Sequence, residues 1–70
     1  MTTLATALHL HGVAARARRA SDVSGAWRDV VYAARCAEKF GRAVRALGDD
    51  DAAELARLVG AAREARRDIQ

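Results

Sequence analysis

Residues 24–47 form the longest stretch of unbroken helical periodicity in the chain. Apolar side chains recur along it at alternating steps of three and four residues, which keeps them on one side of an α-helix. This core-facing set consists of Val30, Ala33, Ala37, Phe40, Val44 and Leu47. The chain has no proline, and its one β-favouring run, residues 30–32, lies inside the helical period. We therefore expect an all-α fold in which this segment is the central helix.

The segments on either side also read as helices. We expect a first helix over about residues 3–20, with Thr2 or Thr3 as its N-cap, and a third helix over about residues 50–69. No linker or repeat divides the chain, so residues 1–70 form a single domain. The predicted architecture is a three-helix bundle, made of a helical hairpin and an N-terminal helix.

The two connections carry residues that favour turns. Ser21 or Ser24 is placed to cap the second helix, because short hydroxyl side chains bond to free backbone amides. Gly48 is placed for a left-handed C-cap, and Asp51 with Glu54 has the spacing of a capping box. These signals predict a tight hairpin between the second and third helices.

The hydrophobic inventory is small. Of the hydrophobic residues, 18 are alanine, and only six Leu and six Val, with single Ile, Phe and Trp residues, remain to build a core. A chain of 70 residues buries only ~60% of its unfolded surface, so small domains often add disulfides, a metal or a second subunit. The single cysteine, Cys36, excludes an internal disulfide. We therefore expect a homodimer.

The first helix has apolar side chains on two sides. Leu4, Ala7, Leu8, His11 and Ala15 form one stripe, and Leu10, Val13, Ala17 and Ala20 form another nearly opposite. Either this helix lies between its own bundle and another subunit, or it bends at Gly12; we favour the first alternative. Trp27 and Val31 widen the apolar side of the second helix, and Tyr32 lies among its cations. The predicted protein interface is Leu10, Val13, Ala17, Trp27, Val31 and Tyr32.

No residue pattern indicates catalysis, a metal or a cofactor. His9 and His11 are two residues apart and point to different sides of a helix, and a pair of Cys36 with His9 has no third residue to orient it. The five glycines are isolated, which excludes a phosphate-binding loop. The acidic run 49–51 is explained by capping a helix N-terminus. We expect a non-enzymatic protein without cofactors.

Arginine supplies eleven of the twelve cations, and the net charge is +3. In an up-down-up bundle the C-termini of the first and third helices would meet and form a basic pole. Its members would be Arg16, Arg18, Arg19, Arg63, Arg66 and Arg67. The pole could bind an anionic partner, or the arginines could simply complement helix dipoles. The acidic start of the third helix argues against a DNA-reading helix-turn-helix.

The sequence therefore predicts a small protein-protein interaction module of regulatory, adaptor or inhibitor type. A non-specific nucleic-acid-binding protein that uses the basic pole is the alternative. The arginine bias also suits a GC-rich coding sequence, such as that of an actinobacterium or its phage. No apolar stretch is long enough to cross a membrane. The acid-free residues 1–21 have the composition of an organelle transit peptide, but we interpret them as a first helix, and the lone cysteine agrees with a cytoplasmic protein.

Overall fold

The computed structural model describes the backbone of residues 2–69 and the side chains of residues 2–67. It contains three α-helices: α1 (Leu4–Ser24), α2 (Trp27–Ala46) and α3 (Asp49–Ile69). No strand occurs within the described backbone, so the predicted all-α, three-helix fold is confirmed. The residues that begin and end the helices differ from the predicted ones by up to four positions, and the largest change is the extension of α1 to Ser24.

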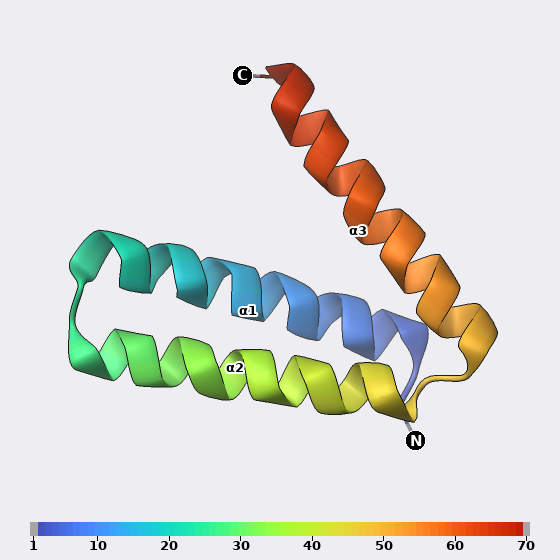
Figure 1. Cartoon of the computed structure of the whole chain (residues 1–70), viewed down its shortest axis with the longest axis horizontal. Helices are drawn as coiled ribbons and strands as arrows, with labels where there is room; N and C mark the ends of the chain where they lie inside the picture. Colours follow the sequence, from blue (N-terminus) through green and yellow to red (C-terminus); the bar gives the residue numbers. More distant parts are fainter. Residues whose placement is uncertain (1, 70) are drawn as a thin grey trace.

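The hairpin of the molecule is formed by α1 and α2, which run antiparallel along their whole length (Figure 1). α3 begins beside the N-terminal end of α1 and then leads away from the hairpin (Figure 1). The hairpin and α3 therefore form the two arms of a V. The prediction of a tight hairpin between the second and third helices is therefore wrong. The physical cause lies in the two connections, which differ in backbone conformation.

The first connection is closed by a left-handed glycine. Gly25 has φ +64°, and its backbone N–H donates to the Ser21 carbonyl oxygen at 2.8 Å. The Ser24 hydroxyl donates to Asp29 Oδ2 at 2.6 Å and accepts from the Ala26 N–H at 3.2 Å. Ser24 thus ends α1 and bridges to α2, whose N-cap is Ala26 without a side-chain cap, so the predicted serine N-cap is wrong. The predicted cap of the first helix is confirmed, since the Thr6 N–H donates to Thr3 Oγ1 at 3.2 Å.

The second connection contains no left-handed residue. Leu47 is extended, with φ −77° and ψ 151°, and Gly25 is the one positive-φ residue in the described backbone, so Gly48 is not the predicted left-handed cap. The predicted capping box is also not formed, because the Glu54 carboxylate pairs with Arg57 in the next turn. An extended residue directs the chain away from the helix that it follows. α3 therefore leaves α2 at a wide angle.

The core lies where the three helices meet. Its buried members are Ala7, Ala43 and Leu55, and the partly buried side chains packed against them are Leu4, Leu10, Phe40, Val44, Leu47 and Val59. This confirms the predicted core face at the C-terminal end of the central helix. The opposite end of that face is not core, since Val30 is 40% exposed. Because α3 diverges, it does not cover that end of the hairpin.

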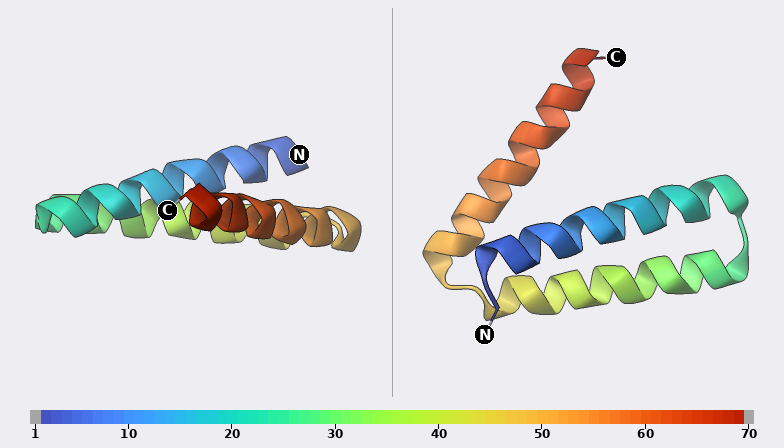
Figure 2. Two further views of the ribbon diagram at one scale, coloured as in Figure 1. Left: turned by 90° about the horizontal axis from the view of Figure 1, so that it is seen from above. Right: turned by 180° about the vertical axis from the view of Figure 1, so that it is seen from behind.

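The molecule is flat and open. Its principal extents are 37 × 32 × 13 Å, and its radius of gyration is 13.2 Å, whereas a compact chain of this length has about 11 Å. Figure 2 shows the thin edge of the molecule and the V from behind. Its accessible surface is 5425 Å² for 7.5 kDa, and a folded monomer of this mass exposes about 4,250 Å². The chain thus exposes about 1,200 Å² more than its size requires.

Candidate protein-binding surfaces

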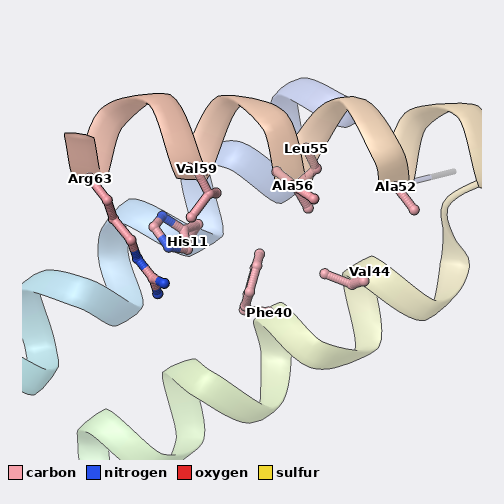
Figure 3. A pocket seen from close by; sticks show the side chains of 9 residues that line it. His11, Phe40, Val44, Ala52, Leu55, Ala56, Val59 and Arg63 are labelled. Carbon is pink, nitrogen blue, oxygen red and sulfur yellow. The ribbon is translucent and has the colours of Figure 1, made fainter. Parts of the chain in front are cut away.

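A hollow of about 420 Å³ lies inside the V, between α3 and the end of the hairpin. Phe40 projects from α2 toward Leu55 on α3, and Arg63 extends from α3 past His11 of α1 (Figure 3). The remaining lining residues are all small or apolar: Val44, Ala52, Ala56, Val59 and Gly60. The His11 ring meets the Phe40 ring edge-on, with centroids 5.3 Å apart and the planes at 65°. This aromatic pair forms the floor of the hollow.

A second hollow, of about 370 Å³, continues along the hairpin toward its far end. It shares His11 and Arg63 with the first hollow, so the two are contiguous. Its other lining residues are five alanines and one arginine: Ala14, Ala15, Ala33, Ala34, Ala37 and Arg18. We refer to the two hollows together as the trough. It is the part of the hairpin that a third helix packed in parallel alignment would have covered.

The charged residues that line the trough are all cationic. Arg18 and Arg63 line it, and none of the described residues that line either hollow is Asp or Glu. The two arginines come from different helices, α1 and α3, whose separation across the V forms the mouth of the trough. The trough is therefore a small-residue groove with cationic edges.

A second exposed surface lies at the turn between α1 and α2, and we call it the hairpin tip. Its members are Val23, which is 89% exposed, and Trp27, which is 78% exposed. Of the neighbouring residues that were predicted as interface, Tyr32 is 58% exposed and Val31 is half-buried. The side chains of Val23 and Trp27 are therefore largely uncovered by the rest of the described chain.

The predicted interface residues of α1 are used largely inside the chain. Leu10 packs against the core and Ala17 is buried. Val13 is half-buried and lines, with Leu10, a groove between α1 and α2. The two apolar sides of α1 are thereby explained, since one faces α2 and the other faces the trough.

The groove between α1 and α2 is lined by both polar and apolar side chains. His9, Tyr32, Arg35, Cys36 and Lys39 line it together with the two apolar residues of α1. The pKa of Tyr32 is raised, chiefly because its hydroxyl shares a hydrogen bond with the Cys36 thiol, and further because of the charge interaction with that thiol and partial desolvation. Arg16 acts in the opposite direction. Cys36 itself is buried and has no disulfide partner.

The six arginines of the predicted basic pole do not gather at one end. The C-terminal ends of α1 and α3 lie apart (Figure 1), and Arg18 and Arg63 are the pair that line one hollow. Arg66 and Arg67 lie in the last turn of α3, where cations are favoured by the helix dipole. α1 has no basic residue in its last turn, because it continues past Arg16, Arg18 and Arg19 to Ser24. The dipole therefore does not account for the three arginines of α1.

No group of three or more His, Cys, Asp or Glu side chains within the described part of the chain is arranged to hold a metal ion. The described helices also include none that is long and apolar enough to cross a membrane. Comparison with known proteins gave no match to a family model, to a curated protein or to a solved structure.

Sequence reasoning missed the trough as a site. Its alanines were visible as small residues on the central helix, a composition that permits close approach of another helix. The missing information was the direction of α3, because a parallel third helix would have occupied this face. The sequence around Leu47 and Gly48 carries no signal for the extended conformation that Leu47 adopts.

Proposed function

We propose that this protein is a small, non-enzymatic protein-protein interaction module of regulatory, adaptor or inhibitor type. The observation that carries this proposal is the exposure of Trp27 at the hairpin tip. Tryptophan is the residue most enriched at binding hot spots, and it is costly to leave in water. Val23, at the same turn, is 89% exposed and adds a second exposed apolar side chain to the hairpin tip.

The excess of accessible surface supports the proposal independently. Stable protein interfaces bury about 800 Å² on each partner, and this chain exposes about 1,200 Å² beyond the expectation for its mass. A partner that covered the hairpin tip or the trough would remove a large part of that excess. The same partner would supply stability that the thin core lacks.

The test is capture of partners from the source cell with the intact protein and with Trp27→Ala. Truncating an anchoring tryptophan typically costs 2 kcal/mol or more, so we expect at least ~30-fold weaker retention of the specific partner. Arg45→Ala, another exposed position on α2, is the control and should retain the partner. Unchanged circular dichroism must accompany both variants. If the two variants capture the same proteins, the hairpin tip is not a binding surface.

Sedimentation equilibrium tests whether a second copy is that partner, because it measures the mass of the protein in solution. Fluorescence then tests whether the hairpin tip is the dimer contact, since Trp27 is the single tryptophan of the chain and its emission reports on that surface. The expected homodimer through the Trp27 and Val31 flank would show a concentration-dependent blue shift of the emission. A monomer whose tryptophan stays solvent-exposed at all concentrations would leave a different protein as the partner.

A further inference from the structure

We propose that the trough binds an amphipathic α-helix of another protein, one with small apolar side chains on its buried face and acidic side chains along the edges of that face. This inference rests on the proposed function and adds the site and the chemistry of the partner. The evidence consists of the shape, the lining and the charge of the trough.

The shape of the trough fits one helix. Its lining residues on α2 run from Ala33 to Val44, which is about 16 Å, or three turns, along the helix axis. The side chains that α1 and α2 present to the trough are mostly alanines, which are short, so the backbone of an incoming helix can approach the hairpin closely. Helix-in-groove binding of this kind is a common mode of peptide recognition.

The lining of the trough selects an apolar face. Phe40 and Val59 provide the larger apolar surfaces at the closed end, and the alanines continue them toward the open end. An incoming helix can therefore bury its larger side chains near Phe40 and its smaller ones along the alanines. That gradient also sets a preferred direction for the bound helix.

The charge of the trough selects acidic edges. Arg18 of α1 and Arg63 of α3 both line the trough, and no acidic residue is among the described lining residues. Rim charges of this type fix specificity and association rate more than they fix affinity. The open half of α3 from a second copy, residues 61–67, is disfavoured as the occupant, because it would bring Arg63, Arg66 and Arg67, against one acid, Glu64, to an already cationic groove.

The experiment uses two fluorescein-labelled helical peptides of about 18 residues, a length that sustains a helix. Both carry leucine and alanine on one face; glutamate flanks that face in the first peptide and lysine in the second. By fluorescence anisotropy we expect the glutamate peptide to bind the intact protein about tenfold more tightly, since each rim pair changes from repulsion to attraction. The preference should shrink as salt rises.

Two sets of variants of the protein complete the test. Arg18→Glu combined with Arg63→Glu should invert the peptide preference, which a merely misfolded protein cannot do. Ala34→Trp should block binding of both peptides by filling the trough, whereas Ala46→Trp, at an exposed position outside the trough lining, should bind as the intact protein does. Equal binding of the two peptides, or undiminished binding to Ala34→Trp, would overturn the inference.

Two further outcomes separate this inference from the proposed function. A homodimer that Ala34→Trp dissociates would show that a second copy occupies the trough, and the inference would be wrong. If Trp27→Ala loses a captured partner while neither peptide binds, the interaction function stands and the trough is not its site.

Discussion

Leu55 is the buried side chain that fastens α3 to the hairpin, and truncating it should weaken the fold more than any comparable change. It is 3% exposed and packs with Ala7 and Ala43. Phe40 and Val44, which pack against the same cluster, are only partly buried and can fill only part of the space that Leu55→Ala leaves. We therefore expect a loss of about 2 to 5 kcal/mol, the range for such substitutions.

The magnitude is large for this chain. Native domains are stable by roughly 0.05 to 0.15 kcal/mol per residue, which for this length gives about 4 to 10 kcal/mol in total. Urea unfolding followed by circular dichroism should show the midpoint falling by at least about 2 M. Leu8→Ala is the matched control, because Leu8 is 40% exposed and should cost only about 1 kcal/mol. Equal losses for the two variants would refute the assignment of Leu55 as the fastening residue.

Two further predictions concern the first connection and the groove between α1 and α2. Gly25→Ala should cost about 1 to 2 kcal/mol in thermal or urea unfolding, because alanine is strained in the left-handed region; no atom lies within 4 Å of the added Cβ, so the loss reports backbone strain alone. Gly60→Ala, inside α3 and equally unobstructed, should stabilise by roughly 0.5 to 1 kcal/mol, and a loss at both glycines would contradict this reasoning. Ultraviolet titration of Tyr32, the single tyrosine, should give a raised pKa that returns toward about 10 in Cys36→Ala and stays raised in Cys36→Ser. Because the pKa of Tyr32 is higher in the folded state than in the unfolded state, its contact with Cys36 stabilises the fold at pH values below the ordinary tyrosine pKa, and this stabilisation is lost as pH rises through the folded pKa. An identical titration of Tyr32 in the two Cys36 variants would exclude the Cys36 contact.

The helices themselves were predictable because their signals are local. Helical periodicity and the Thr3 cap each depend on residues close in sequence, and the structure confirms the three helices and this cap. The C-terminal core face of the central helix was also predictable, since Phe40, Val44 and Leu47 are the large side chains of one stripe. Local signals therefore sufficed for the elements and for one end of the core.

The arrangement of the helices was not predictable by the same means. The prediction placed the left-handed cap at Gly48, whereas Gly25 adopts it. Gly25 follows the extended α1, whereas Leu47 and Leu55 beside Gly48 pack into a core that the sequence does not display. The trough and the hairpin tip depend on that docking. Leu10 and Ala17 pack within the chain and Trp27 is 78% exposed, and the assignment of these residues to a protein interface stays a prediction.

The second half of α3 carries one more consequence. Residues 61–67 are all exposed, so this segment receives little packing energy from the hairpin. A helical segment of this length is marginal in water by itself, because nucleation and end effects outweigh its few internal hydrogen bonds. It should interconvert with coil in the free protein and become fully helical when a partner covers it. Binding then carries an ordering cost, which lowers affinity for a given contact area and lets the complex be released and formed again quickly.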